Sequence, residues 1–204
     1  MPTPASLTRF IAACSAFACL LVGSADAAYT VTFRQVGADV VATGVGSLDL
    51  SAISPADSSG INSSVVQANY GLAVGAGPVA ASLYAPISGP TAIGPGTTLF
   101  AANSGTGTQA GVASFPSATY VVVDSTFTGG ALSGSSTWNN TTIAALGLAP
   151  GTYTWTWGAG PALDSFTVIV TGSQTGVPTL SQWGLLLMSL SLGGFALYGA
   201  RQKN

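Results

Sequence analysis

The fold is decided by the stretch TYTWTW at residues 152–157, the turn GAGP at 158–161 and the run DSFTVIV at 164–170. Large apolar residues alternate with small polar ones, which gives each run one apolar face. The stretch therefore predicts an antiparallel hairpin, and burying each of its rings would contribute about 2 kcal/mol. The predicted core face consists of Tyr153, Trp155, Trp157, Phe166, Val168 and Val170.

The same alternation occurs in residues 29–35, where Tyr29, Val31 and Phe33 fall on one face of a predicted strand. Gly37-Ala38-Asp39 then predicts a turn. In the next run Val41 and Val45 occupy odd positions, whereas Leu48 and Leu50 occupy even positions, so the two pairs would lie on opposite faces of one regular strand. The change falls at Gly46, where a β-bulge would reset the faces, so we expect a bent strand or a strand pair.

The middle of the chain, residues 51–117, breaks into short apolar pieces separated by Gly and Pro. Such a pattern predicts short strands and long loops. The predicted strands lie near residues 64–68, 78–84, 97–101 and 111–115. Residues 103–107 predict a loop or a tight turn. Residues 120–123 predict a buried strand, and residues 141–146, between Asn140 and Gly147, predict a single helical turn.

These patterns indicate an all-β fold, and we expect an immunoglobulin-like or jelly-roll-type β-sandwich. Residues 148–153, Leu-Ala-Pro-Gly-Thr-Tyr, are typical of the corner of an immunoglobulin-like sandwich, in which a short crossing leads to a strand that opens on Tyr. We expect this ectodomain to cover residues 28–176, which is an ordinary size for one domain.

The N-terminal residues predict a secretory signal peptide over residues 1–27. Arg9 precedes an almost wholly apolar run from Phe10 to Val22. Ala25 and Ala27 are small residues at the positions that a signal peptidase reads, so the mature protein would begin at Ala28. A lipoprotein signal at Cys14 is disfavoured, because only four apolar residues precede that cysteine.

The C-terminal stretch from residue 184 to 200 carries no charge. At about 1.5 Å per residue, roughly 17 residues span about 25 Å, enough to cross the hydrocarbon core of a thin bilayer. Arg201 and Lys203 follow this stretch, which places the C-terminus in the cytoplasm. We therefore expect one transmembrane helix in the inner membrane and a periplasmic ectodomain.

The residues that precede and open this apolar stretch form the motif Pro-Thr-Leu-x-x-Trp-Gly. The motif consists of Val177, Pro178, Thr179, Leu180, Trp183 and Gly184. Together with the helix and the short basic end, it resembles the bacterial IPTL-CTERM sorting signal, a relative of PEP-CTERM, over residues 177–204. The resemblance implies recognition by an exosortase, a membrane transpeptidase-like protease, and transfer of the exported protein to the cell surface or extracellular matrix.

Two departures from the usual pattern leave an alternative open. Val177 stands in place of the usual Ile, and the end Arg-Gln-Lys-Asn is less basic than the usual Arg cluster. The alternative is a plain membrane anchor in which Pro178-Thr179-Leu180 is only a linker. A second stretch, residues 133–170, is similar to the body of uncharacterised PEP-CTERM exported proteins. That group has no assigned activity, so this similarity transfers no site.

Residue usage excludes several classes of function for the body. It contains five Asp, one basic residue, Arg34, and no His, Lys or Glu. It also has no Cys, because both cysteines lie in the predicted signal peptide. Nucleic acid and anionic lipid require clustered Lys and Arg. Triad hydrolysis, zinc chemistry and Schiff-base chemistry lack their residues. An Asp pair could serve a glycosidase, but no pattern indicates one. Asp49 and Asp57 lack neighbouring oxygen ligands for calcium, and we expect no metal and no cofactor.

The leading hypothesis is a non-enzymatic surface or matrix protein whose partners are signal peptidase, the general secretion machinery and an exosortase. The alternative is a carbohydrate-binding surface module that contacts extracellular polysaccharide, since aromatic rings stack on sugars. Trp138 is the candidate glycan contact, because it lies beside Asn139 and Asn140 in a polar stretch. Trp155 and Trp157 are expected in the core instead.

Overall fold

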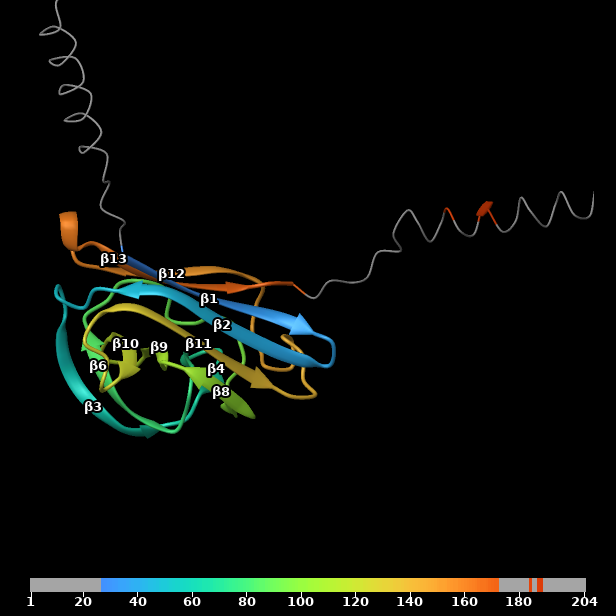
Figure 1. Ribbon diagram of the computed structural model, residues 1–204, viewed down its shortest axis with the longest axis horizontal. Coiled ribbons are helices and arrows are strands. Elements are labelled where there is room, and N and C mark those ends of the chain that lie inside the picture. The colour runs from blue at the N-terminus through green and yellow to red at the C-terminus, as the bar shows by residue number, and fades with distance from the viewer. Residues whose placement is uncertain (1–26, 173–183, 185–186, 189–204) are drawn as a thin grey trace, which may run out of the picture. The chain divides into compact units, whose positions relative to one another are not determined.

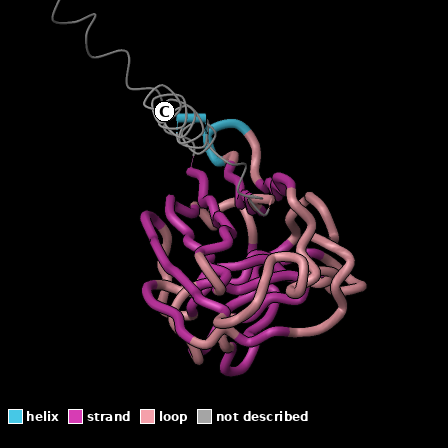
Figure 2. Tube along the Cα trace, turned by 90° about the vertical axis from the view of Figure 1, so that its right-hand side faces the viewer, coloured by secondary structure: helices cyan, strands magenta, loops and turns pink. Residues whose placement is uncertain are grey.

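The computed structural model describes residues 27–172, 184, 187 and 188 of the 204-residue chain. Strands and loops make up nearly all of residues 27–172 (Figures 1 and 2). The predicted signal peptide up to residue 26 and most of the predicted membrane segment lie outside the described residues. Among those that are described, no helix is long and apolar enough to cross a membrane.

One sheet has six strands in the order β12-β13-β1-β2-β11-β8. Its strands are β1 (Ala27–Val36), β2 (Asp39–Leu48), β8 (Ser104–Gly107), β11 (Gly130–Trp138), β12 (Gly151–Trp157) and β13 (Asp164–Val170). All neighbours are antiparallel except β1 and β13, which pair in parallel from Ala27↔Asp164 to Phe33↔Val170. The first and last strands of the described domain are therefore neighbours.

The other sheet has seven strands in the order β3-β6-β10-β9-β5-β4-β7, and every pair in it is antiparallel. Its strands are β3 (Ser54–Asn62), β4 (Val65–Gln67), β5 (Gly71–Val74), β6 (Val79–Ala85), β7 (Phe100–Ala101), β9 (Ala110–Ser114) and β10 (Thr119–Asp124). One apolar core contains buried residues from both sheets, such as Phe33 of β1 and Val121 of β10. The all-β prediction is thus confirmed.

The hairpin formed by β12 and β13 contributes the largest rings to this core, as the sequence predicts. Trp155 lies opposite Phe166, and their ring centroids are 6.4 Å apart. Trp155 also donates from Nε1 to the carbonyl oxygen of Pro90 at 2.7 Å, so its polar atom is satisfied inside the core. The turn contains a short 3-10 helix, η2 (Gly160–Ala162).

Strand β1 also confirms its prediction, whereas β2 corrects one. The buried side chains of β2 are Val40, Ala42 and Leu48, while Val45 is 66% exposed. No register shift interrupts the pairing of β2 with β1 or β11, so there is no bulge at Gly46. The hydrophobic pattern of β2 is misleading because of Gly44, which occupies an inward position and is buried under the Tyr29 ring. A Cβ at Gly44 would lie 2.0 Å from the Tyr29 hydroxyl oxygen, so the strand buries backbone where the pattern lacks an apolar side chain.

In the middle of the chain the predicted strands near 64–68, 78–84, 97–101, 111–115 and 120–123 correspond to β4, β6, β7, β9 and β10. Four strands were missed, namely β3, β5, β8 and β11. The expectation of a loop or turn at residues 103–107 is wrong, because β8 pairs with β11 from Thr137↔Ser104 to Gly134↔Gly107. The sequence SGTG of β8 has no large apolar residue, so no hydrophobic alternation could reveal it.

The region between β11 and β12 contains the predicted helical turn. Leu146 donates its N–H to the carbonyl of Thr142 at 3.0 Å, and the hydroxyl of Thr142 accepts from Ala145 at 3.1 Å. Thr142, rather than Asn140, is therefore the cap. The hydroxyl of Tyr153 then donates to the carbonyl of Ala149 at 2.9 Å. This bond reaches back four residues, as in the tyrosine corner of immunoglobulin-like sandwiches.

Asp164 joins the start of β13 to the segment that follows β2. It is buried, and its carboxylate accepts N–H bonds from Asp49, at 2.6 Å, and from Ser165. Burial raises the pKa of Asp164 from 3.8 to about 6, against the lowering effect of the two N–H groups, and the charge of Asp49 adds to the increase. The folded state therefore holds this proton more tightly than the unfolded state does.

We predict that Asp164 makes the domain less stable as the pH rises from about 4 to about 6. The stabilising contribution of the protonated acid is complete below the unfolded pKa of 3.8 and is lost as the pH passes the folded pKa of about 6. The wild type should lose on the order of 1 to 2 kcal/mol relative to Asp164→Asn over this range, as measured by urea unfolding. Parallel pH profiles of the two proteins would contradict the prediction.

Candidate functional site

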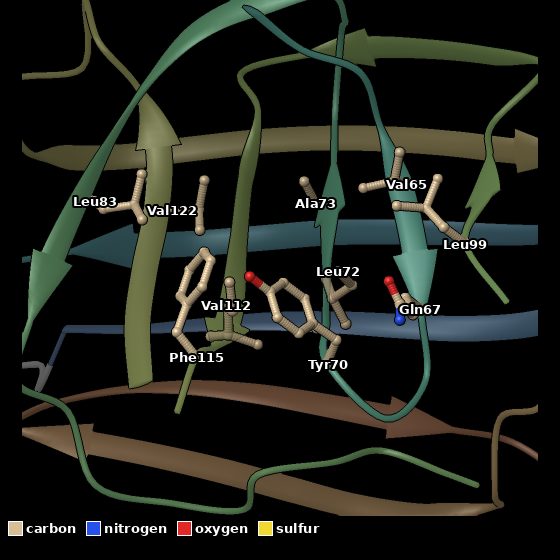
Figure 3. A pocket seen from close by; sticks show the side chains of 12 residues that line it. Val65, Gln67, Tyr70, Leu72, Ala73, Leu83, Leu99, Val112, Phe115 and Val122 are labelled. Atoms are coloured by element: carbon tan, nitrogen blue, oxygen red, sulfur yellow. The ribbon is translucent and has the colours of Figure 1, made fainter. Parts of the chain in front are cut away.

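The outer face of the seven-stranded sheet carries a hollow of about 220 Å³ (Figure 3). Leu83 and Val122, on one side of it, belong to a small apolar cluster that is separate from the main core. Val65 and Leu99 lie on the other side, as Figure 3 shows. The hollow therefore faces away from the six-stranded sheet.

Small residues on β5 and β9 form the floor of the hollow, and they explain why a hollow exists there. Gly71, Ala73 and Ala113 line it and leave little side chain above the sheet. Gly71 has φ +157°, and a Cβ added to it would lie 2.1 Å from the carbonyl oxygen of Val112 on the neighbouring strand. The close approach of β5 and β9 thus requires glycine at this position.

A row of three aromatic rings borders one end of the hollow. The centroids of Tyr70 and Phe115 are 4.9 Å apart and those of Phe115 and Tyr120 are 5.4 Å apart, both with edge-to-face geometry. Figure 3 shows Tyr70 and Phe115 adjacent to each other. Leu99 and Phe115 are 57% and 39% exposed, so a ligand can reach the hollow from solvent.

Two hairpin turns place Tyr70 and Phe115, whereas Tyr120 belongs to strand β10. Tyr70 follows β4 in a turn closed by its N–H bond to the carbonyl of Gln67 at 2.9 Å. Phe115 follows β9 in a turn closed by its N–H bond to the carbonyl of Ala118 at 2.9 Å. Ser114 links the turns by donating to the carbonyl of Tyr70 at 2.7 Å. The ring positions are therefore fixed by backbone hydrogen bonds.

The polar groups at the hollow are an amide and a phenol. Gln67 donates from Nε2 to the carbonyl of Thr97 at 3.0 Å and to Asn69 Oδ1 at 3.2 Å, which leaves its Oε1 without a hydrogen bond from the described residues. The Tyr70 hydroxyl likewise makes none within that part of the chain, and desolvation raises its pKa. None of the lining residues is an acid or a base other than this phenol.

This arrangement suits binding of an uncharged ligand with an apolar face. The hollow is smaller than the roughly 300 to 1,000 Å³ of sites for drug-sized ligands, so it fits one ring-sized unit. Residues 27–172 contain no group of three or more His, Cys, Asp or Glu that could hold a metal ion.

Trp138, the candidate glycan contact, lies elsewhere and is only 2% exposed. Its ring centroid is 5.7 Å from that of Phe33, and its Nε1 donates to the carbonyl of Phe100 at 3.1 Å. A glycan contact requires an exposed ring, and this ring is buried, because Trp138 is the last residue of β11 on the inward face and its polar neighbours Asn139 and Asn140 begin the following turn. A sugar cannot stack on it.

The hollow cannot be identified from local sequence patterns. Tyr70, Phe115 and Tyr120 are separated along the chain and meet only when the β4–β5 and β9–β10 hairpins pair side by side. The available signal was an aromatic residue directly beside each of two strands, which is common in β proteins. The floor gave no signal, because Gly and Ala are also typical of loops.

The predicted sorting residues Val177, Pro178, Thr179, Leu180 and Trp183 lie outside the described residues, as do Ala25, Arg201 and Lys203. Gly184 is helical. Of the predicted signal peptidase positions, Ala27 is the first residue of β1. The structure therefore places the expected mature N-terminus, Ala28, within this strand.

Residues 175–202 match the family model described as the IPTL-CTERM motif. The match confirms the resemblance found for residues 177–204 and indicates an exported protein that an exosortase-type system sorts. No curated protein and no solved structure matches the chain.

Proposed function

We propose that this protein is a non-enzymatic component of the cell surface or extracellular matrix. The IPTL-CTERM motif at residues 175–202, carried on a chain whose described domain is all-β, is the observation that supports the proposal most directly. Signal peptidase and the secretion machinery would deliver the ectodomain to the periplasm. The C-terminal helix would hold it in the inner membrane until the exosortase acts.

The residues of the domain support a role without catalysis. Its candidate site combines ring edges, an amide and a phenol, and these groups suit binding better than bond cleavage. We further propose that the two sheets form an immunoglobulin-like or jelly-roll-type sandwich. The bond from Tyr153 to Ala149 and the parallel pairing of β1 with β13 support the immunoglobulin-like form.

The sorting signal is tested by separating the motif from the helix. We predict that replacing Pro178-Thr179-Leu180 with alanines leaves the protein exported and membrane-bound but unprocessed. Proline fixes φ and keeps the preceding segment extended, which is the conformation a protease reads. Immunoblots of membrane, surface and medium fractions measure the mass and location of the product.

The matched control places two Asp within residues 185–188 and leaves the motif intact. Charges in the apolar segment disfavour its insertion into the bilayer, so this variant should be released without anchoring. Processing and sorting of the alanine variant at the level of the parent would contradict the proposal and leave residues 177–204 as a plain anchor.

A carbohydrate-binding surface module is the second candidate function. The buried ring of Trp138 cannot support it. The observation that favours it is the hollow beside Tyr70, Phe115 and Tyr120, which has the aromatic rings that Trp138 was expected to supply and also the amide of Gln67.

A further inference from the structure

The hollow on the seven-stranded sheet has two properties that together define a ligand class. Its walls are apolar, from Leu83, Val122 and Leu99, and a ring at its end, Phe115, is partly exposed. It also presents two polar groups that form no hydrogen bond with another described residue, Gln67 Oε1 and the Tyr70 hydroxyl. A purely apolar ligand would leave these two groups unpaired, which costs free energy.

The absence of charged side chains around the hollow restricts the class of ligand further. No lining residue carries a charge at neutral pH, and the body of the chain has a single basic residue, Arg34. Arg34 lies on β1 of the other sheet. A uronate, sulfate or phosphate group would therefore lose its hydration at the hollow without gaining a cation. The site favours a neutral ligand.

The size of the hollow indicates whether its ligand is a narrow polymer chain or a folded protein. Specific protein interfaces bury about 800 Å² on each partner. A hollow of about 220 Å³ accommodates one ring-sized unit, and two of the side chains that line it, Leu99 and Phe115, are exposed to solvent. These properties fit one residue of a polymer that continues beyond the hollow.

We propose that this hollow is a binding site for a neutral polysaccharide, with one sugar ring seated over Ala73 and Ala113. The apolar face of the sugar packs against Phe115, while Gln67 Oε1 accepts a bond from a sugar hydroxyl and the Tyr70 hydroxyl pairs with another. The inference deepens the proposed function and rests on it, because export brings the domain to a surface where such polymers occur.

The test measures binding of the full chain, purified in detergent, to soluble neutral glucan, mannan and galactan, with alginate as the anionic comparison. Affinity electrophoresis reports the retardation of the protein. At least one neutral polymer should bind, and alginate should not. Phe115→Ala should weaken binding by roughly 10- to 100-fold, as expected for an aromatic anchor. Ala113→Trp should abolish it by filling the hollow.

Two further variants separate recognition from stability. Gln67→Leu keeps the size of the side chain and removes its whole amide, including the Oε1 acceptor and the Nε2 donor to Thr97 and Asn69, so it should weaken binding several-fold. Val45→Ala removes an exposed apolar side chain from the other sheet and should leave binding unchanged. Thermal unfolding identifies any variant that no longer folds. If Phe115→Ala is one of these, Ala113→Trp and Gln67→Leu decide the outcome.

Three results would overturn the inference: no retardation by any of the neutral polymers, equal retardation of the hollow variants and the parent, or equal binding of alginate. Self-association that disappears in Phe115→Ala, without glycan binding, would assign the hollow to a second copy of the chain instead. C-terminal processing of Phe115→Ala should remain normal. Loss of glycan binding with normal C-terminal processing thus tests the hollow alone. Processing of the Pro178-Thr179-Leu180 alanine variant tests the sorting signal alone.

Discussion

Trp155→Ala is expected to lower the free energy of unfolding by about 3 to 5 kcal/mol, the range for deleting a buried indole ring. The ring lies at the centre of the β12–β13 hairpin, against Phe166, and is almost fully buried. Its removal also takes away the Nε1 donor that satisfies the carbonyl of Pro90. Since small domains have total stabilities of about 5 to 15 kcal/mol, the variant would be near or beyond unfolding at 25 °C.

Urea unfolding followed by tryptophan fluorescence and circular dichroism measures this change. Val45→Ala is the matched control, because Val45 is an exposed side chain in the six-stranded sheet and its truncation should change stability by less than about 0.5 kcal/mol. A loss below about 1 kcal/mol for Trp155→Ala would contradict the assignment of this face to the core.

The hairpin and strand β1 were predictable because local pattern and tertiary environment agree there. Tyr29, Val31 and Phe33 alternate with polar residues, and all three are buried. A strand with one face on a core and one on solvent shows this alternation whatever its partners are. The parallel pairing of β1 with β13 was not predictable, because it joins residues about 137 positions apart and no local pattern encodes it.

Strands β2 and β8 show where local pattern fails. In β2 the inward position 44 is glycine, and the Tyr29 ring of the neighbouring strand fills the space above it. The core is continuous there although the sequence of β2 has a gap. In β8 the strand SGTG forms because β11 offers an edge to pair with, not because it buries a side chain.

The candidate site was harder to predict than the fold. Its floor depends on Gly71 and Ala113 lying next to each other on neighbouring strands, where the register pairs one directly with the other. Tyr70 and Phe115 come from two turns, which the backbone hydrogen bond from Ser114 to Tyr70 joins. By contrast, the sorting motif was identified from sequence, because its residues are contiguous and act in order along the chain.

Trp138→Ala should be nearly as destabilising as Trp155→Ala, by about 3 to 5 kcal/mol, although its neighbours in sequence are polar. The ring packs on Phe33 in the core, and its Nε1 is the donor to the carbonyl of Phe100. Strand β7, which contains Phe100, has only two residues, so this hydrogen bond is a substantial part of what attaches it.

Trp138→Phe separates the two contributions. It keeps an aromatic ring against Phe33 and leaves the carbonyl of Phe100 without its donor, which should cost about 1 to 2 kcal/mol from the lost bond, with a smaller packing loss. Both variants are compared with the parent by urea unfolding and by retardation on the neutral polymers. Trp138→Phe should bind glycan as the parent does, because the ring is buried in the core and does not line the hollow. Loss of glycan binding in a Trp138→Phe protein that is still folded would assign the contact to Trp138 and not to the outer sheet.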